Sequence, residues 1–341
     1  MRILLITDAW HPQVNGVVRT WQRVGEECRT LGHQFEVVSP DLFRTVPCPT
    51  YPEIRLAIAP RRRLERHIDA FRPNAVHIAT EGPLGLSGRR LCLKRGWPFT
   101  TSYHTKFPEY VAARAPVPVA LGYAVVRWFH RPARAVLTAT PTLRRELEAK
   151  GFTNCLDWSR GVDTDLYHLD RPPALDLPRP VFAYVGRVAI EKNLEAFLDL
   201  DLGGTKLVVG DGPDRAKLER RYPDAVFAGA QFGEDLAAHY TSADAFVFPS
   251  RTDTFGLVML EALASGLPVA AFPVTGPLDV VGGSGCAVLD EDLAAAAGRA
   301  LDVPRQRCRD YALRFSWTRT ARQFLDALAP ITASATSGAA D

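Results

Sequence analysis

The chain has 341 residues, a formal net charge of +3 and 47% hydrophobic residues. A single hydrophobic core rarely extends beyond about 250–300 residues, so this length predicts two domains. The six cysteines lie far apart and include no C-x-x-C pair, which argues against a disulfide framework or a zinc ribbon. We therefore expect reduced thiols and a cytoplasmic protein.

Positive charge is concentrated in the first half of the chain. Residues 1–165 contain 24 Lys and Arg against 15 Asp and Glu, whereas the remainder contains 17 against 23. The first half is therefore a candidate to face an anionic surface, either lipid headgroups or nucleic acid. The N-terminus lacks the features of a signal peptide, and the longest uncharged stretches are too short or too broken by Pro and Gly to span a bilayer. Any membrane contact is expected to be peripheral.

Short apolar runs alternate with helical patterns along the first half. The predicted strands are residues 2–7, 34–39, 75–78, 99–103 and 135–138. Continuous apolar strands between helices predict a parallel sheet that is covered on both faces. After the proline-rich residues 168–180, the alternation restarts with VFAYVG, KLVVG, AVFAG, AFVFPS, PVAAF and CAVL.

This pattern predicts an α/β protein with two Rossmann-like domains, residues 1–167 and 168–315, with the proline-rich segment as the linker. Residues 314–328 place Trp317, Ala321, Phe324 and Leu328 at helical spacing, which predicts an amphipathic helix over about 316–330. The tail 332–341 is predicted to be disordered.

The first candidate binding segment is residues 7–18, where a strand runs through Asn15 and Gly16 into a helix. A glycine at such a turn lets the backbone approach a phosphate, and a helix N-terminus favours negative charge. An ordinary Asn-Gly turn is the alternative explanation.

The second candidate segment is residues 185–193, VGRVAIEKN, with Arg187 directly after a strand and Lys192 five residues later. Arg can hold a diphosphate through two parallel hydrogen bonds, and Lys acts as a compact point charge. Isolated cations are more often solvated surface residues. Their place at the carboxyl end of a strand favours a ligand, because open α/β sheets bind ligands there.

The third segment, residues 250–266 (SRTDTFGLVMLEALASG), carries the strongest signal. Asp253 is expected on the turn before a helix, and Glu261 about two turns into it. The Glu261 carboxylate can accept both ribose hydroxyls of a nucleotide, and free backbone amides at the helix start can bind phosphate or sugar oxygens. The alternatives are an N-cap for Asp253 and an exposed helical acid for Glu261. The predicted contacts of this segment are Asp253, Thr254, Phe255, Gly256, Leu257 and Glu261.

These motifs, together with GDGP at residues 210–213 and FPS at 248–250, resemble retaining glycosyltransferases of family 4 type with the GT-B fold. Residues 77–85 (HIATEGPLG) and 101–110 (TSYHTKFPEY) resemble a branch of bacterial glycolipid-forming glucosyl-, sulfoquinovosyl- and mannosyltransferases. The resemblance runs from Met1 to about Phe324. It implies two Rossmann-like domains that face each other across a cleft, with the C-terminal helix crossing back to the first domain.

The resemblance also implies roles for single residues. It assigns Gly16 and Gly210 to the nucleotide-sugar site, Arg187 and Lys192 to the diphosphate, Glu261 to the ribose, His104 to the transferred sugar, and Glu81 and Tyr103 with His104 to the acceptor side. Two positions depart from the family pattern: Asp253 stands where Glu is usual, and Arg160 stands where Asn is usual.

A retaining transfer without a metal or other cofactor needs fixed positive charge to stabilise the leaving diphosphate, which Arg187 and Lys192 can supply. The resemblance implies front-face attack, with His104 orienting the sugar. A UDP-hexose such as UDP-glucose is the favoured donor, with GDP-mannose next. The expected acceptor is a membrane lipid such as diacylglycerol, and a soluble sugar or polysaccharide is the alternative.

Three other interpretations remain open. A metal-dependent transferase would need an Asp-x-Asp pair, for which Asp163 with Asp165 and Asp199 with Asp201 are candidates. An NAD-dependent oxidoreductase would need G-x-G-x-x-G after the first strand, where the chain has only Gly16. A sugar-nucleotide-binding or membrane-docking module without turnover is the third.

A lipid-docking helix is predicted over residues 61–71, RRRLERHIDAF. Leu64, Ile68 and Phe71 lie at helical spacing beside four arginines, which is typical of a cationic helix at a headgroup surface. Residues 127–131 (RWFHR) add aromatic side chains. Ordinary core residues beneath a solvated arginine face are the alternative. We expect peripheral association with the inner face of the cytoplasmic membrane and no binding of nucleic acid.

Overall fold

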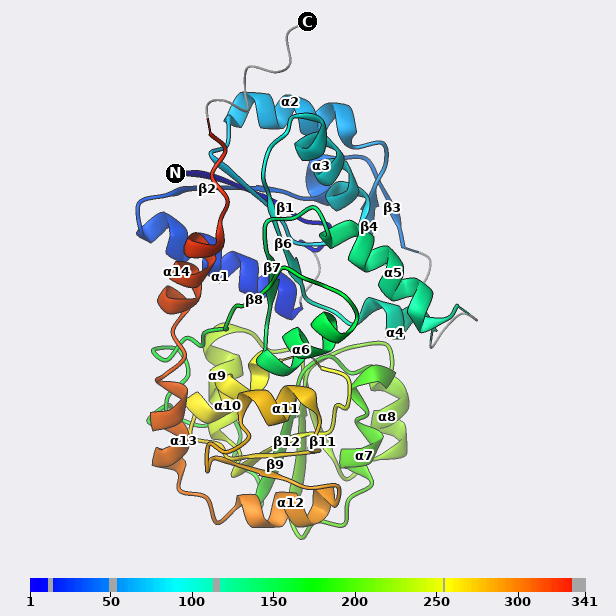
Figure 1. The fold of residues 1–341 in the computed structure, drawn as a ribbon. Coiled ribbons are helices and arrows are strands. Elements are labelled where there is room, and N and C mark those ends of the chain that lie inside the picture. Colours follow the sequence, from blue (N-terminus) through cyan, green and yellow to red (C-terminus); the bar gives the residue numbers. More distant parts are fainter. Residues whose placement is uncertain (12–14, 49–53, 113–116, 254, 333–341) are drawn as a thin grey trace, which may run out of the picture. The chain divides into compact units, whose positions relative to one another are not determined.

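The computed structural model describes the chain except for residues 12–14, 49–53, 113–116, 254 and 333–341. The chain divides into two compact units (Figure 1). Unit 1 comprises Met1–Ser159 with Trp317–Asp341, and unit 2 comprises Arg160–Ser316. The tail that was predicted to be disordered lies almost wholly outside the described residues.

Unit 1 is built on a six-stranded parallel sheet of order β2-β1-β5-β6-β7-β8. Its strands are β1 (Arg2–Ile6), β2 (Gln34–Val38), β5 (Ala75–Ile78), β6 (Thr100–Tyr103), β7 (Val136–Thr138) and β8 (Cys155–Asp157). A short antiparallel hairpin is formed by β3 (Thr45–Pro47) and β4 (Arg55–Ala57). The helices are α1 (Gly16–Thr30), η1 (Pro40–Leu42), α2 (Arg61–Phe71), α3 (Pro83–Lys94), α4 (Phe107–Ala112), α5 (Val119–His130), α6 (Pro141–Ala149) and α14 (Trp317–Ala327).

Unit 2 is built on a second six-stranded parallel sheet, of order β11-β10-β9-β12-β13-β14. Its strands are β9 (Val181–Val185), β10 (Thr205–Val209), β11 (Val226–Gly229), β12 (Ala245–Phe248), β13 (Val269–Ala271) and β14 (Ala287–Leu289). Its helices are η2 (Ile190–Lys192), α7 (Glu195–Leu198), α8 (Arg215–Arg221), α9 (Gly233–Thr241), α10 (Leu257–Ala264), α11 (Thr275–Val280), α12 (Leu293–Ala300) and α13 (Arg305–Ala312).

The predicted parallel α/β architecture is confirmed in both units. Every residue of β5, β6, β9 and β12 is buried, because these strands lie inside their sheets and are covered on both faces. The sequence analysis missed β8 and the β3–β4 hairpin. Strand β8 lies at the edge of its sheet and leaves Leu156 45% exposed, so it lacks the continuous apolar run of the inner strands.

Each sheet has a point at which the strand order reverses. In unit 1 it lies between β1 and β5, and in unit 2 between β9 and β12. Loops that leave the carboxyl ends of such neighbouring strands diverge to opposite faces and open a crevice for ligands. The segments after β1, β5, β9 and β12 are therefore the places to look for a site.

The proline-rich segment is not a free linker, which corrects the prediction. Residues 160–180 belong to unit 2, and the Ala174 amide donates to the Ala238 carbonyl at 3.0 Å. The Leu175 amide donates to Ser242 Oγ at 3.0 Å, and Arg171 forms an ion pair with Glu234. Proline lowers the cost of ordering an extended chain, so the segment lies along α9 without forming a helix or strand.

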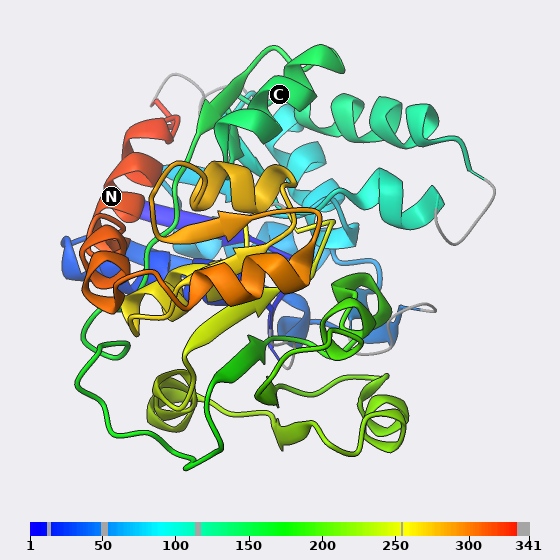
Figure 2. The same cartoon turned by 90° about the horizontal axis from the view of Figure 1, so that it is seen from below.

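Helix α14 packs against α1, and the two helices lie side by side in Figures 1 and 2. Phe324 of α14 is fully buried, with its ring centroid 5.2 Å from Trp21 and 6.2 Å from Trp158. The Trp158 indole N–H donates to the Thr320 carbonyl at 3.0 Å. The end of the chain thus completes the core around the first helix.

The lipid-docking prediction for residues 61–71 is wrong in one respect. Leu64 and Ile68 of α2 are 0% and 1% exposed and belong to the core of unit 1, and Phe71 packs against the same core. The arginines of this helix face solvent together with Asp69 and Ala70, because the core of unit 1 takes the apolar side. Among the described residues, no helix is long and apolar enough to cross a bilayer.

Candidate active site

In unit 2, Lys192 and Asp253 meet at the point where the strand order reverses. Lys192 Nζ lies 2.6 Å from Asp253 Oδ1, and the two side chains are 24% and 18% exposed. Asn193 Nδ2 donates to the Pro249 carbonyl at 3.1 Å, which fastens η2 to the segment after β12. The sequence-predicted cation and carboxylate are therefore one partly desolvated ion pair, with half-buried Arg187 at the end of β9 beside η2.

The second oxygen of Asp253 adds a specific feature to this pair. Asp253 Oδ2 is buried and makes no hydrogen bond to any described residue. Buried carboxylate oxygens are normally satisfied, so an unsatisfied one marks a place for a ligand hydroxyl. The shorter Asp therefore leaves one acceptor oxygen available although its other oxygen binds Lys192.

Burial keeps the neighbouring tyrosine neutral. Tyr184 of β9 is 1% exposed, and burial, with the charges of Asp253 and Glu191, raises its pKa far above the ordinary value. Its hydroxyl donates to the Arg187 carbonyl at 2.8 Å. This hydrogen bond fixes the backbone from which the Arg187 side chain extends.

Glu261 lies in the second turn of α10 and is 8% exposed. The fully buried Tyr240 of α9 donates its hydroxyl to Glu261 Oε2 at 2.9 Å. This bond orients the Glu261 carboxylate. The sequence analysis missed Tyr240, because a tyrosine at helical spacing carries no signal that separates a partner from a core residue.

The start of α10 holds the other predicted contacts of this segment. Gly256 has a φ of 79°, and a Cβ there would lie 2.9 Å from Met259 Cε, so a larger residue is strained. Leu257 is half-buried and Phe255 is 8% exposed, with the Arg160 guanidinium 5.9 Å from its ring. Burial lowers the pKa of Arg160 to about 9. Thr254 lies outside the described residues.

Gly210 has a packing role at the end of β10. A Cβ at this position would lie 1.8 Å from the Gly186 carbonyl oxygen. The two strand ends can therefore approach each other only because Gly210 lacks a side chain.

In unit 1, exposed Gly16 begins α1 directly after Asn15. Asn15 Oδ1 accepts from the amides of Val17 and Val18, both at 3.0 Å. The side chain thus satisfies two of the helix-terminal amides, which reduces the number left for a phosphate.

The residues predicted for the acceptor side differ in their exposure. His104 and Glu81 are half-buried, and Glu81 Oε1 lies 3.0 Å from Nε2 of the fully buried His130. Tyr103, in contrast, is 0% exposed and packs in a core cluster with Tyr123, so it cannot contact an acceptor. Tyr103 ends an inner strand with its side chain on the covered face.

The sequence analysis also missed Asp8, which follows β1. Asp8 accepts from the amides of Leu84 at 2.9 Å and Gly85 at 3.1 Å, at the start of α3. Burial raises its pKa, although these hydrogen bonds oppose the shift. A Cβ at Gly82 would lie 2.4 Å from Asp8 Cγ, so Gly82 makes room for this cap.

The carboxylates of the two Asp-x-Asp triplets make local hydrogen bonds. Asp163 Oδ1 accepts from the amides of Asp165 and Leu166 in a local turn, and Asp199 Oδ1 accepts from the Tyr222 hydroxyl at 2.5 Å. Within the described part of the chain, no three His, Cys, Asp or Glu side chains lie close enough to hold a metal ion.

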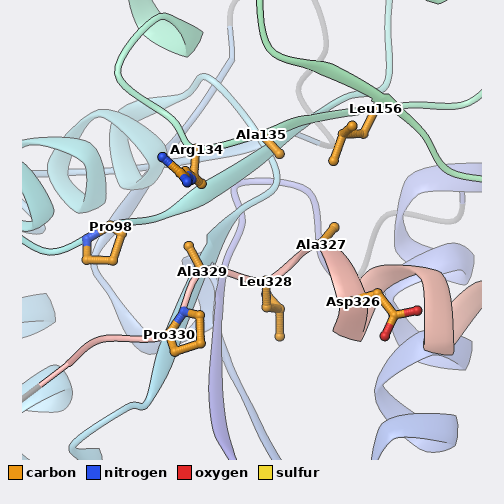
Figure 3. A pocket seen from close by; sticks show the side chains of 9 residues that line it. All are labelled: Pro98, Arg134, Ala135, Leu156, Asp326, Ala327, Leu328, Ala329 and Pro330. Carbon is orange, nitrogen blue, oxygen red and sulfur yellow. The ribbon is translucent and has the colours of Figure 1, made fainter.

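A pocket of about 560 Å³ lies elsewhere in unit 1 (Figure 3). Its lining includes Pro98, Arg134 and Ala135, which precede β6 and β7, together with the chain that follows α14. It therefore lies toward the amino ends of these strands, away from the edge that carries His104 and Glu81.

Comparison with known proteins agrees with this geometry. Residues 14–166 match Glycosyltransferase Family 4, and residues 179–303 match Glycosyl transferases group 1. A GDP-mannose-dependent alpha-mannosyltransferase of Mycobacterium tuberculosis is 32% identical over 82% of the chain and 81% of the relative. A sulfoquinovosyl transferase of Arabidopsis thaliana is 31% identical over 79% of the chain and 58% of the relative. The alpha-monoglucosyldiacylglycerol synthase of Streptococcus pneumoniae is 26% identical over 80% and 71%.

Among solved structures, the sucrose-phosphate synthase of Thermosynechococcus elongatus superimposes with a TM-score of 0.77. The match covers 95% of the chain and 97% of that structure at 21% identity. This likeness shows that the two proteins share a fold.

The positions of Arg187 and Lys192 lead to a prediction about nucleotide binding. Replacing Arg187 or Lys192 with Ala should weaken binding of a nucleoside diphosphate about 10-fold or more, because each removes a charge-assisted contact. Isothermal titration with UDP and with GDP measures the effect. Lys217→Ala is the matched control, since Lys217 pairs with Glu195 on the surface of the same unit and is 62% exposed. Unchanged affinity in both site variants would contradict the assignment.

Proposed function

The chain belongs to glycosyltransferase family 4, and on this premise we propose that it transfers a hexosyl unit with retention from a nucleotide-diphosphate sugar to a membrane lipid such as diacylglycerol. The oxidoreductase alternative has no support, because β1 leads through Gly16 alone into α1 instead of through three spaced glycines. Membership of a family of enzymes likewise argues against the interpretation of the chain as a binding module without turnover.

The observation that carries the proposal is the Lys192–Asp253 pair at the reversal point of the unit 2 sheet. Departure of a diphosphate develops negative charge, and fixed cations stabilise that charge without reorganisation. Lys192 and Arg187 supply two such cations, so we propose that neither a metal nor another cofactor is needed. Asp253 Oδ2 and Glu261 supply acceptors for sugar and ribose hydroxyls.

Two donors are proposed on different grounds. UDP-glucose or another UDP-hexose is the donor class that the sequence resemblance favours. GDP-mannose is supported by the 32% identical relative from Mycobacterium tuberculosis, which is a GDP-mannose-dependent alpha-mannosyltransferase. The contacts proposed for Arg187, Lys192 and Glu261 are to diphosphate and ribose, which both donors contain.

A donor screen tests this function. We expect release of UDP from UDP-glucose, or of GDP from GDP-mannose, together with labelled product in diacylglycerol-containing vesicles and in the presence of excess EDTA. Transfer from neither donor would contradict the proposal. Loss of activity on chelation, with recovery on Mg²⁺ or Mn²⁺, would contradict metal independence.

The lipid acceptor is supported by an exposed apolar stripe on α5. Leu121, Val125 and Trp128 are 57%, 56% and 50% exposed, at spacings of four and three residues. Arg89 lies 4.0 Å from the Trp128 ring centroid and donates to the Trp128 and Phe129 carbonyls at 3.0 Å. Exposed Arg131 follows on the same helix end. Arg89 is itself only 8% exposed, so it supports Trp128 from below and Arg131 is the cation beside the stripe. Exposed apolar side chains beside a cation suit an anionic headgroup surface.

We therefore place peripheral docking to the inner face of the cytoplasmic membrane on α5. The arginines of α2 add long-range attraction, although its apolar side chains are buried. The soluble sugar or polysaccharide acceptor remains the alternative, and nucleic acid is not proposed as a partner.

Co-sedimentation with vesicles tests the docking stripe. A variant with Leu121, Val125 and Trp128 all replaced by Ser should lose about 10-fold or more of its binding to anionic vesicles. The matched control replaces Leu278, Leu301 and Leu313, which are 50%, 38% and 52% exposed in unit 2. Binding of the parent should weaken with salt. Equal binding by both triple variants would contradict the α5 assignment.

A further inference from the structure

A connected set of polar side chains runs through unit 1 to His104. His77 Nδ1 lies 2.8 Å from Thr100 Oγ1, and His77 Nε2 lies 3.2 Å from Ser102 Oγ. Ser102 Oγ lies 2.9 Å from His104 Nε2, and Trp21 Nε1 lies 3.0 Å from the same nitrogen. Two different groups therefore contact one ring nitrogen of His104, the residue that the family resemblance places near the transferred sugar.

These two groups impose different conditions on the imidazole. A serine hydroxyl both donates and accepts, so Ser102 alone is compatible with a proton on either ring nitrogen of His104. An indole N–H only donates. Trp21 therefore requires a lone pair on His104 Nε2, and a proton there would leave a buried indole N–H without its acceptor.

The surroundings of Trp21 prevent the indole from turning away. Trp21 is 0% exposed, and its ring centroid lies 4.6 Å from His77, 4.9 Å from Trp158 and 5.2 Å from Phe324. The ring of His104 stands at 85° to it, with 5.9 Å between the centroids. Phe324 comes from α14, so the end of the chain helps to hold the indole on His104.

His77 cannot supply a competing charge to this set. It is fully buried, and burial, with a smaller effect of His130, lowers its pKa to about 3. His77 is therefore neutral near pH 7, and the chain from Thr100 to Trp21 contains hydrogen bonds between neutral groups.

We propose that Trp21 is a positioning residue that fixes His104 as the tautomer with its proton on Nδ1. In this form the N–H donor of His104 is on Nδ1, and Nε2 is an acceptor. His104 takes no proton from the acceptor through Nε2, because that nitrogen accepts from Trp21. The inference rests on the proposed function for the role of His104, whereas the tautomer itself depends only on the geometry of unit 1.

Nitrogen NMR of histidine-labelled protein reads the tautomer directly and requires no turnover. The parent protein should show His104 with a protonated Nδ1 and an unprotonated Nε2, with His104→Asn used to assign the signals. Trp21→Phe keeps a ring but removes the donor, and should shift His104 toward Nε2 protonation, with Ser102 as the acceptor. Trp158→Phe is the matched control: it keeps an aromatic ring against Trp21 and removes only an indole N–H that binds the Thr320 carbonyl, so it should leave the tautomer unchanged.

Kinetics give the second readout. The assay uses whichever of UDP-glucose or GDP-mannose is turned over. Trp21→Phe should lower kcat about 10-fold. The donor KM should change little, because the residues proposed to bind its diphosphate and ribose lie in unit 2. Trp158→Phe should keep kcat even where it lowers the thermal unfolding temperature. In a His104→Asn background the effect of Trp21→Phe on kcat should largely disappear, because an amide has no tautomer to fix.

The two readouts separate this inference from the proposed function. A protein that turns over neither donor refutes the function, while the NMR measurement still decides the tautomer. A parent protein with the proton on Nε2, or a Trp21→Phe variant with an unchanged tautomer, overturns the role of Trp21. An equal loss of kcat in Trp21→Phe and Trp158→Phe also overturns it.

Discussion

In each unit, the connections from two neighbouring parallel strands run in opposite directions, which leaves the carboxyl ends of these strands open. This constraint brings the candidate site residues of each unit together. In unit 2 it brings η2, which follows β9, against the segment that follows β12, so that Lys192 meets Asp253. In unit 1 it places Asp8 after β1 beside Thr80 and Gly85 after β5. Residues far apart in the sequence thus meet without a long loop to carry them.

Charge balance explains how a cationic binding site can exist before a ligand binds. An isolated, partly buried ammonium is costly, and Asp253 compensates Lys192 at 2.6 Å. The same carboxylate keeps one buried oxygen unsatisfied, which a bound hydroxyl would complete. In unit 1, neutral groups position the candidate site residue. Trp21 and Ser102 contact His104 through hydrogen bonds, within a core to which Phe324 contributes.

The sequence predicted those features that depend on local pattern. Inner strands such as β5 and β12 could be predicted because both faces are covered and every residue is apolar or buried. Arg187, Lys192, Asp253 and Glu261 could be predicted as site residues from the spacing of their motifs. The predictions that failed depended on which way the side chains point. Leu64 and Ile68 formed a convincing amphipathic pattern, yet the sheet uses that face, while the exposed stripe on α5 lies on a helix that is apolar on both sides. Trp21, Tyr240 and Tyr103 are aromatics at regular spacing, so only packing separates a partner from a core residue.

In the proposed reaction, fixed cations of the protein stabilise a leaving diphosphate while the acceptor attacks the same face of the sugar. The most direct test is the anomeric configuration of the isolated product, read from the one-bond coupling between the anomeric carbon and its proton. Retention predicts an α-glycoside from an α-linked donor. A β-glycoside would contradict it.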